Sequence, residues 1–282
     1  MRLTLHAQAK INWSLSICGE REDGYHDLDM LMQSIALSDE LSFENARWIT
    51  LSVDGQRLPC GDRNLVVRAA NALNEALGLH RGARITLKKH IPARAGLGGG
   101  SADCAATLLA LNRLWDLNLP LRTLMQIGLK LGADVPFCLQ RGLARAQGVG
   151  EILTPCAGAP DYPLVMVTPG GGLSTPQVFK AWSVGGYPMT PVDTPALAAA
   201  LLTGDLAAAQ RLAHNDLEAP AISLMPEIGE LIERFRALGA DFVRMTGSGS
   251  TVFAAFHDEA RARAAAAQVP GAILTHTSGP IR

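Results

Sequence analysis

A glycine-rich segment between a predicted strand and a predicted helix is the part of the sequence best suited to chemistry. Gly96, Gly98, Gly99 and Gly100 fall within five positions and are followed by Ser101. Glycine lets an anion approach the backbone closely, and the free amides at the start of a helix attract negative charge. The segment therefore predicts a phosphate-binding loop.

Three known phosphate loops and a plain linker compete for this segment. A Walker loop requires a lysine before its hydroxyl residue, and no lysine precedes Ser101. The dinucleotide fingerprint lacks its third glycine, and the acidic residue about 20 positions on, Asp116, ends a helical run. A protein-kinase loop requires later His-Arg-Asp and Asp-Phe-Gly motifs, which do not occur. A linker is disfavoured because a predicted strand at 85–89 and a predicted helix at 102–115 flank the glycines.

The pattern Pro-x-x-x-Gly-Leu-Gly-Gly-Gly-Ser at 92–101 resembles the nucleotide loop of the GHMP small-molecule kinases, which include galactokinase, homoserine kinase and mevalonate kinase. The resemblance covers nearly the whole chain. Six further segments resemble one branch of the family, whose members phosphorylate the 2-hydroxyl of 4-diphosphocytidyl-2-C-methyl-D-erythritol with ATP in the non-mevalonate isoprenoid precursor pathway. These segments are 9–12, 21–26, 132–137, 175–180, 215–218 and 246–249.

The resemblance implies an α/β (α+β two-layer) architecture, the two-domain GHMP kinase fold. An N-terminal ATP-binding domain at 1–154 is expected to be similar to ribosomal protein S5 domain 2. A C-terminal α/β sandwich at 155–282 is expected to contribute to the substrate cleft. The proline and glycine content of residues 155–160 also favours a boundary there, and 282 residues suffice for two modest domains.

Hydrophobic periodicity and turn residues predict the order of the elements. Strands are expected near 3–5, 10–15, 31–36, 48–53, 85–89, 143–147, 152–154, 164–167, 242–245 and 251–256. Helices are expected from 64 to 77, with Asn64 acceptable as the N-cap, and near 102–115, 121–131, 176–182, 195–203, 205–213 and 260–267. Residues 134–136 are expected as an irregular turn. A further helix is predicted from the apolar stripe across 222–238, which we interpret as core and not as a cofactor site.

Asp134 and Lys10 are the predicted catalytic residues. Asp134 precedes Val135-Pro136 in an apolar turn, where an unpaired carboxylate is costly to bury; the alternative is an aspartate that caps a turn. For Lys10 the alternative is an ordinary solvent-facing lysine on a strand. The resemblance implies that Asp134 accepts the proton of the acceptor hydroxyl. It also implies that Lys10 lies beside Asp134 and offsets charge on the phosphoryl oxygens.

The resemblance implies that ATP binds through the glycine loop and through three residues on the adenosine side. Ser101 also has the position of a helix N-cap, and the two roles are compatible. We expect Mg²⁺ to be held mainly by the ATP phosphates and water. Arg94 and Ala95 stand where the family often has glycine or another small residue. The loop residues are Pro92, Ala93, Arg94, Ala95, Gly96, Leu97, Gly98, Gly99, Gly100, Ser101 and Ala102, and the adenosine-side residues are Asn64, Val66 and Lys89.

Substrate specificity is assigned to aromatic residues that are far apart in the sequence. The resemblance implies that Tyr25 and Phe179 sandwich the cytosine and that His26 reads its edge, whereas each alone would be a half-buried structural residue. Asn12 and Thr175 are implied contacts to the erythritol and diphosphate portions. The glycine turn at 246–250 predicts a hairpin from its residues alone, and the resemblance implies that it packs against the loop. Residues 215–218 are expected to be structural.

Charge, cysteine content and the length of apolar runs disfavour a nucleic-acid-binding protein, a disulfide-bonded protein and a membrane-spanning protein. The formal net charge is −1 and the basic residues are scattered, which disfavours nucleic-acid binding. Five cysteines without paired spacing indicate reduced thiols, and no apolar run approaches the roughly 20 residues of a membrane span. We expect a cytoplasmic enzyme, a monomer or weak homodimer, with small-molecule substrates and no nucleic-acid or membrane partner. Another GHMP kinase, a silent nucleotide sensor and a dehydrogenase remain alternatives.

Overall fold

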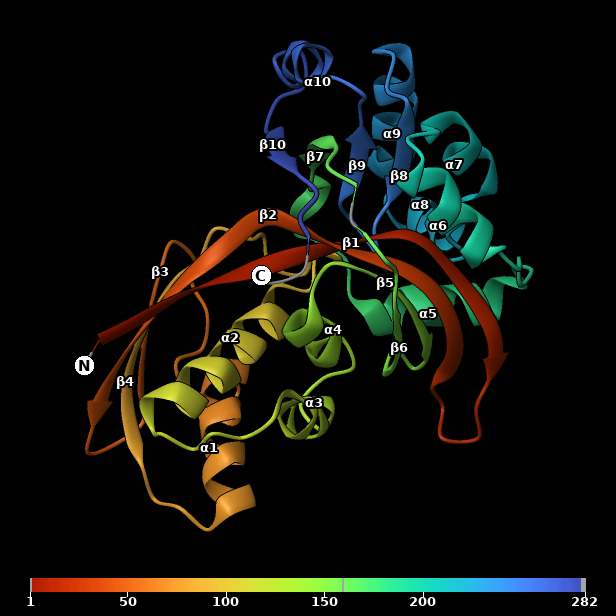
Figure 1. Cartoon of the computed structure of the whole chain (residues 1–282). Coiled ribbons are helices and arrows are strands. Elements are labelled where there is room, and N and C mark those ends of the chain that lie inside the picture. Colours follow the sequence, from red (N-terminus) through yellow and green to blue (C-terminus); the bar gives the residue numbers. More distant parts are fainter. Residues whose placement is uncertain (1, 159, 280–282) are drawn as a thin grey trace. The chain divides into compact units, whose positions relative to one another are not determined.

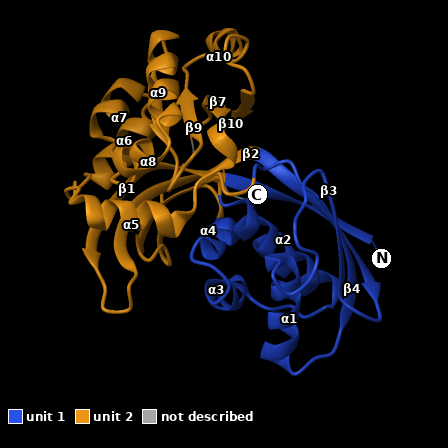
Figure 2. Ribbon diagram, turned by 180° about the vertical axis from the view of Figure 1, so that it is seen from behind, with its two compact units in different colours: residues 1–9, 37–92, 98–140 blue, residues 10–36, 93–97, 141–282 orange. Residues whose placement is uncertain are grey.

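The computed structural model describes residues 2–158 and 160–279. Residues 1, 159 and 280–282, which fall within the predicted domains, lie outside the described residues. The chain forms two compact units that interleave along the sequence, as the colours of Figure 2 show. Unit 1 contains residues 1–9, 37–92 and 98–140, and unit 2 contains residues 10–36, 93–97 and 141–282. The single domain boundary expected between residues 154 and 155 stays a prediction.

Two long strands, β1 (Arg2–Glu20) and β2 (His26–Ala46), contribute residues to both units (Figure 1). The predicted short strands at 3–5, 10–15 and 31–36 are parts of these two strands. The gap predicted between 3–5 and 10–15 was wrong because β1 is continuous there, whereas residues 21–25 do separate β1 from β2. Residues 9–17 are all buried, which means that both faces of β1 are covered there. A strand buried on both faces shows no alternation of apolar and polar residues, and its true length is hidden from periodicity.

Unit 1 combines part of a sheet with four helices. The second half of β2 pairs antiparallel with β4 (Gly82–Lys88), and β4 pairs parallel with β3 (Thr50–Asp54). Phe43 opposes Ile85 across the β2–β4 ladder, and both are fully buried. The helices are α1 (Leu65–Leu77), α2 (Gly99–Leu114), α3 (Leu121–Leu129) and α4 (Val135–Gln140), of which α1 packs against α2 (Figure 1).

Helix α4 begins at Val135, so the irregular turn expected at 134–136 was wrong for Val135 and Pro136, whereas Asp134 does lie in a turn before the helix. The proline that suggested a turn, Pro136, lies in the first turn of α4. A proline is accepted there because the first amides of a helix have no intrahelical acceptor. The carbonyl of Asp134 already accepts the amide of Cys138 at 3.0 Å, which places Asp134 directly at the start of this helix.

Unit 2 contains the rest of the strands and helices. The first half of β2 pairs antiparallel with β5 (Leu143–Gly148), which pairs with β6 (Ile152–Pro155). A separate antiparallel sheet has the order β10-β7-β9-β8, from Ile273–His276, Pro163–Val167, Val252–Ala255 and Phe242–Met245. The strand β10 was not predicted. The helices are α5 (Thr175–Gly185), α6 (Thr194–Leu202), α7 (Leu206–Leu212), α8 (Glu218–Leu224), α9 (Glu227–Ala237) and α10 (Glu259–Ala266), with a 3-10 turn at Pro169–Gly171.

The apolar stripe at 222–238 belongs to two helices, α8 and α9, and not to the one predicted. The break falls at Met225 and Pro226, where Met225 has a non-helical backbone with φ of −147°. Proline disfavours the helical conformation of the residue before it and cannot donate to the preceding turn. The apolar spacing continues through the break because Ile228, Ile232 and Phe235 of α9 are buried in the core.

An aromatic cluster anchors β1 in the core of unit 2. The ring of Trp13 meets Phe242 edge-on at 4.8 Å and Phe253 at 5.5 Å between centroids. The indole Nε1 donates to Oε1 of Gln33 on β2 at 2.8 Å, which satisfies its buried N–H. Trp13 follows Lys10 and Asn12 on the strand, so the cluster holds the segment that carries these two predicted site residues.

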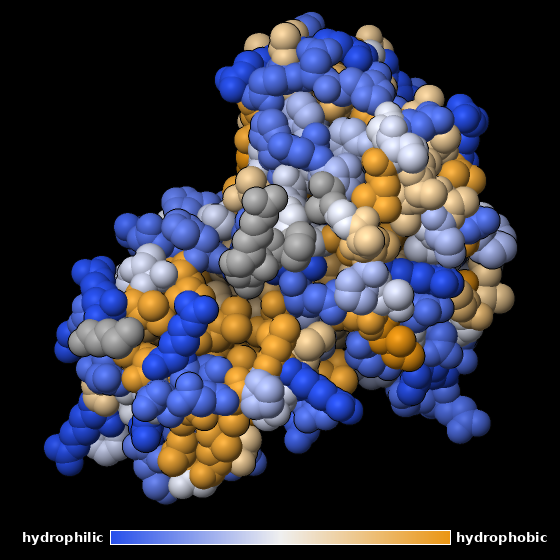
Figure 3. Space-filling model, viewed as in Figure 1, coloured by the Kyte–Doolittle hydropathy of each residue, from blue (hydrophilic) through white to orange (hydrophobic). Residues whose placement is uncertain are grey.

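The surface of the face drawn in Figure 3 mixes hydrophilic and hydrophobic residues. Hydrophobic residues gather mostly over the part of this view where Figure 1 shows the helices of unit 1. Isolated exposed apolar side chains are normal on a folded protein. Within the described residues, no helix combines the length and the apolar character that crossing a membrane requires.

Candidate active site

The first turn of α2 offers three backbone amides to an anion. Helix α2 begins at Gly99 with Gly98 as its N-cap, so Ser101 lies within the first turn and is not the N-cap that was expected. The amide of Ala102 is the first to bond within the helix, to the carbonyl of Gly98 at 2.9 Å. The amides of Gly99, Gly100 and Ser101 have no intrahelical acceptor. They lie at the positive end of the helix dipole, which suits a phosphate.

The turn that carries Asp134 lies against this first turn of α2. A Cβ built on Gly132 would lie 3.6 Å from Oγ of Ser101 and 3.5 Å from Cγ2 of Val135. Helix α4, which starts right after Asp134, packs against α2. The structure therefore brings the segment of the predicted general base to the predicted phosphate site within unit 1.

The start of α1 also lies beside the start of α2. Asn64 caps α1, since its Oδ1 accepts the amide of Val66 at 3.0 Å, and the predicted N-cap is confirmed. Val66 is fully buried. A Cβ on Gly100 would lie 3.4 Å from Cδ1 of Leu65. Two of the predicted adenosine-side residues are thus next to the loop, with the side-chain oxygen of Asn64 engaged in the cap.

The third predicted adenosine-side residue, Lys89, is buried, and its ammonium is engaged by carboxylates. Its Nζ donates to Oδ2 of Asp103 at 2.8 Å and also to Oδ2 of Asp39. Neither aspartate was singled out from the sequence. Asp103 follows the glycine loop within α2, but its partner Lys89 lies on another element, so no local pattern indicates the pair.

The first half of the loop, residues 93–97, belongs to unit 2 and is held there by its backbone. The amide of Lys10 donates to the carbonyl of Leu97 at 3.0 Å, and the amide of Thr251 donates to the carbonyl of Ala95 at 3.3 Å. Gly96 has a φ of 76°, and a Cβ there would collide with the carbonyl of Thr246. The glycine turn at 246–250 therefore packs against the loop, as the resemblance implied, and it connects the antiparallel strands β8 and β9 as the hairpin prediction required.

Arg94, which stands where the family often has a small residue, has a left-handed backbone conformation. It has a φ of 56° and an exposed side chain. This left-handed backbone conformation favours glycine, which accounts for the small residues that the family often has at this place. A Cβ on Gly172 would collide with the carbonyl of Arg94, so the backbone of Arg94 is held in place while its side chain reaches solvent.

Lys10 and Asn12 form a buried polar cluster with the 246–250 turn. The Nζ of Lys10 donates to Oδ1 of Asn12 at 2.7 Å, and the amide of Asn12 donates to Oγ1 of Thr246 at 2.9 Å. Lys10 is only 5% exposed, so it is not an ordinary surface lysine. A Cβ on Gly247 would lie 3.4 Å from this Nζ. Nδ2 of Asn215 donates to the carbonyl of Gly247 at 2.9 Å, which is a structural role, as expected for 215–218.

Two of the predicted specificity residues, His26 and Phe179, come together in a second cluster of unit 2. His26 stacks on Phe179 with centroids 4.7 Å apart, while Tyr25 beside it is 64% exposed. On the same helix α5, Oγ1 of Thr175 lies 2.7 Å from Oγ of Ser248. Trp182, which sequence reasoning missed, meets His26 edge-on at 5.6 Å. Its position three residues after Phe179 would have placed it on the same helix face.

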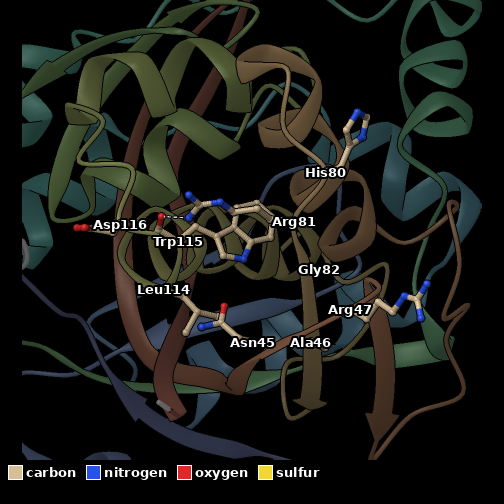
Figure 4. A pocket seen from close by; sticks show the side chains of 9 residues that line it. All are labelled: Asn45, Ala46, Arg47, His80, Arg81, Gly82, Leu114, Trp115 and Asp116. Atoms are coloured by element: carbon tan, nitrogen blue, oxygen red, sulfur yellow. Dashed lines mark hydrogen bonds between the residues drawn. The ribbon is translucent and has the colours of Figure 1, made fainter.

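A separate pocket of unit 1 lies away from the predicted phosphate site (Figure 4). It has a volume of about 470 Å³ and includes the end of α2, whereas the loop is at the start of α2. A rise of 1.5 Å per residue puts the two ends of this helix about 22 Å apart. Arg81 donates to the carbonyl of Trp115 there. The lining residues are Asn45, Ala46, Arg47, His80, Arg81, Gly82, Leu114, Trp115 and Asp116.

Sequence-family models match both halves of the chain. Residues 64–142 match the GHMP kinases N terminal domain, and residues 197–273 match the GHMP kinases C terminal domain. Among solved structures, a crystal structure of 4-(cytidine 5'-diphospho)-2C-methyl-D-erythritol kinase has a TM-score of 0.84 and 39% identity, covering 98% of this chain and 100% of the other. Homoserine kinase from Cytophaga hutchinsonii shares the fold with a TM-score of 0.76 at 18% identity, covering 99% of this chain and 95% of the other.

Curated relatives match over nearly their whole length. The 4-diphosphocytidyl-2-C-methyl-D-erythritol kinase of Pelotomaculum thermopropionicum is 44% identical over 95% of this chain and 94% of its own length. The protein of the same name from Moorella thermoacetica is 43% identical over 98% of this chain and 99% of its own length. The chain therefore belongs to the GHMP kinases, in the family of the 4-diphosphocytidyl-2-C-methyl-D-erythritol kinases.

Proposed function

We propose that this chain transfers the γ-phosphoryl group of ATP to the 2-hydroxyl of 4-diphosphocytidyl-2-C-methyl-D-erythritol, giving the 2-phosphate and ADP in the non-mevalonate isoprenoid precursor pathway. The names of its relatives support this substrate. The observation that carries the chemistry is the contact of the Gly132–Asp134 turn with Ser101, beside three amides free for a phosphate.

Asp134 acts as the general base in this proposal. It orients the hydroxyl and collects its proton late, because phosphoryl transfer proceeds through a loose transition state with little deprotonation beforehand. Lys10 offsets the charge that develops on the phosphoryl oxygens. Its burial supports this role, since a buried ammonium interacts more strongly with nearby charge than one in water.

The nucleotide binds along the loop. The amides of Gly99, Gly100 and Ser101 hold the terminal phosphates, with the rest of residues 92–102 shaping the loop. Asn64, Val66 and Lys89 lie on the adenosine side. Mg²⁺, which neutralises the phosphate charge, is held through ATP oxygens and water, with the hydroxyl of Ser101 as the protein group best placed to assist. The described residues contain no group of three His, Cys, Asp or Glu side chains suited to a metal ion.

The alcohol substrate binds through its cytosine and diphosphate. Tyr25 and Phe179 flank the base, and His26 reads its edge. Asn12 and Thr175 contact the erythritol and diphosphate portions. Among the described residues no two cysteines are joined by a disulfide, and a cytoplasmic location is part of the proposal. We further propose a monomer or weak homodimer, with domains at 1–154 and 155–282.

A coupled assay of ADP release tests the proposal. The purified chain is given ATP and Mg²⁺ with the CDP-alcohol, mevalonate or homoserine in parallel. We expect turnover with the CDP-alcohol alone, and its loss on chelation of Mg²⁺. Turnover with mevalonate or homoserine would assign another GHMP kinase activity, and nucleotide binding without turnover of any alcohol would support a silent sensor.

A further inference from the structure

Three buried ionisable side chains lie together beside the first turn of α2. Lys89 donates from Nζ to Oδ2 of Asp103 at 2.8 Å and to Oδ2 of Asp39. The side chains of Lys89, Asp39 and Asp103 are 3%, 0% and 4% exposed. We call these three residues the Lys89 cluster. Buried charges are retained only where they are paired, so this arrangement is a constructed feature of unit 1.

Asp39 connects the cluster to the segment that leads into the loop. Its Oδ1 accepts the amide of His90 at 2.6 Å and the amide of Ile91 at 2.8 Å. With the ammonium of Lys89 on the other oxygen, the carboxylate of Asp39 accepts hydrogen bonds from three donors. Strand β2 thereby holds residues 89–91 from the side.

The carboxyl of Asp103 has fewer hydrogen-bond partners than that of Asp39. Within the described chain its Oδ1 is buried and has no hydrogen-bond partner, while its Oδ2 accepts from Lys89. Burial raises the pKa of Asp103 to about 8, and the neighbouring Asp39 adds to this rise while Lys89 opposes it. A protonated Asp103 leaves Lys89 and Asp39 as a balanced ion pair. The adjacent Cys104 is a neutral thiol, because burial raises its pKa to about 12, with Arg68 opposing the rise.

Lys89 lies against the first two turns of α2. A Cβ on Gly99 would lie 3.0 Å from Nζ of Lys89 and 2.9 Å from Cγ2 of Ile91, so this position has no room for a side chain. Asp103, one helical turn later, accepts the hydrogen bond from the same ammonium. The free amides of Gly99, Gly100 and Ser101 lie between these two contacts along the helix.

We propose that Lys89 and Asp103 are positioning residues that fix the phosphate-binding amides of α2 relative to the strand segment 89–91. The proposal rests on the proposed binding of ATP at this turn. The ammonium of Lys89 is used by two carboxylates and shielded from solvent, so it acts on the loop and not on the nucleotide. Amides that must meet a phosphate lose affinity and rate when they are displaced by as little as about 1 Å.

The test compares two variants at the same position. Asp103→Ala removes the hydrogen bond yet leaves Lys89 and Asp39 as a balanced pair, whereas Asp103→Asn keeps an acceptor for Lys89. We expect Asp103→Ala to raise the KM for ATP and the Kd for AMP-PNP about tenfold to hundredfold. The KM for the CDP-alcohol and the Kd for adenosine should change less than about twofold, and Asp103→Asn should stay within about threefold of the parent protein for all four constants.

Several outcomes would overturn the inference. Unchanged AMP-PNP binding in a folded Asp103→Ala variant would remove the positioning role. An equal loss of adenosine affinity would show a nucleoside contact instead. A loss in Asp103→Asn as large as that in Asp103→Ala would show that the hydrogen bond from Lys89 is not the relevant contact.

A second measurement covers the case in which Asp103→Ala does not fold. The Kd of AMP-PNP is measured for Asp103→Leu, which removes the acceptor for Lys89 but fills a similar space, and for Asp103→Asn. We expect Asp103→Leu to bind AMP-PNP about tenfold or more weakly than Asp103→Asn, because only the asparagine keeps an acceptor for Lys89. Equal Kd values for these two variants would contradict the inference. If the two Kd values differ in this way but the parent protein phosphorylates no CDP-alcohol, the proposed function fails while the positioning role stands.

Discussion

The imidazole of His26 stacks on the ring of Phe179, with centroids 4.7 Å apart and an angle of 29° between the planes. The edge of Trp182 closes the cluster at 5.6 Å and 88° from His26. His26 starts β2 and Phe179 lies on α5, so two distant segments of unit 2 supply the pair. Stacked aromatic rings of this kind present a rigid surface to a flat base, and little ordering is left for the moment of binding.

Replacing the aromatic ring of Phe179 with an aliphatic side chain should weaken binding of the alcohol substrate. Base–aromatic stacking contributes about 1–3 kcal/mol, so Phe179→Leu is expected to raise the KM for the CDP-alcohol about tenfold or more. The KM for ATP should be unchanged. Steady-state kinetics with each substrate varied in turn measures both constants. Trp48→Leu is the control, because Trp48 is 69% exposed and belongs to no predicted site; a similar rise there would remove the specific role of Phe179.

Replacing Asp134 with a neutral residue should abolish most turnover and leave the affinity for nucleotide unchanged. A general base contributes about 10²–10⁴ in rate, so Asp134→Asn is expected to lower kcat by that factor. The Kd of AMP-PNP, measured by calorimetry, should stay within about twofold of the parent value. The exposed Asp116 provides the matched control Asp116→Asn. A preserved kcat in Asp134→Asn would refute the role of this carboxylate.

Position 96 requires glycine for two reasons, because its φ angle is positive and because the carbonyl of Thr246 lies too close for a Cβ. Gly96 and Gly171 both have a φ of 76°, but a Cβ collides with the carbonyl of Thr246 only at Gly96 and meets nothing within 4 Å at Gly171. We expect Gly171→Ala to lower the free energy of unfolding by about 1–2 kcal/mol. Gly96→Ala should cost clearly more. Urea unfolding of the full chain measures both, and equal losses would mean that the collision has no energetic weight.

Asp103 should make the protein less stable as the pH rises, whereas a carboxyl group with a lowered pKa makes a protein more stable as the pH rises. Its pKa rises from 3.8 to about 8 on folding, so the native state binds more protons than the unfolded state between about pH 4 and pH 8. The contribution of this carboxyl to stability is therefore complete below about pH 4 and falls as the pH rises to about 8. Relative to Asp103→Asn, the parent should lose free energy of unfolding between pH 5 and pH 8.5. A difference that does not vary with pH would contradict this.

Some features of the site were predictable because they depend on local sequence. The spacing of glycines at 96–100 and the helix-forming residues after them indicate free amides at a helix start, whatever the rest of the fold does. The N-cap role of Asn64 was predictable for the same reason. The start of α2 was placed too late, since glycine is a poor helix former in the interior but is accepted in a first turn.

Features that depend on contacts between distant segments were not predictable in this way. The long strand β1 was divided because burial on both faces of residues 9–17 removes the alternation that marks a strand, and of β2 only residues 31–36 were predicted. The cluster of Lys89 with Asp39 and Asp103 was missed because each residue lies on a different element. The resemblance placed Lys89 near the nucleotide, but only the structure shows what its ammonium contacts.

By itself the sequence determined the spacing of the glycine loop and the motifs that resemble the GHMP kinases, and the roles of the loop, of Asp134 and Lys10 and of the aromatic rings stay predictions from that resemblance. The tertiary structure alone decided which of these groups are neighbours, which are buried and which are already engaged. Local spacing sets backbone conformation over a few residues, whereas burial and ion pairing arise only when segments far apart in the chain pack together.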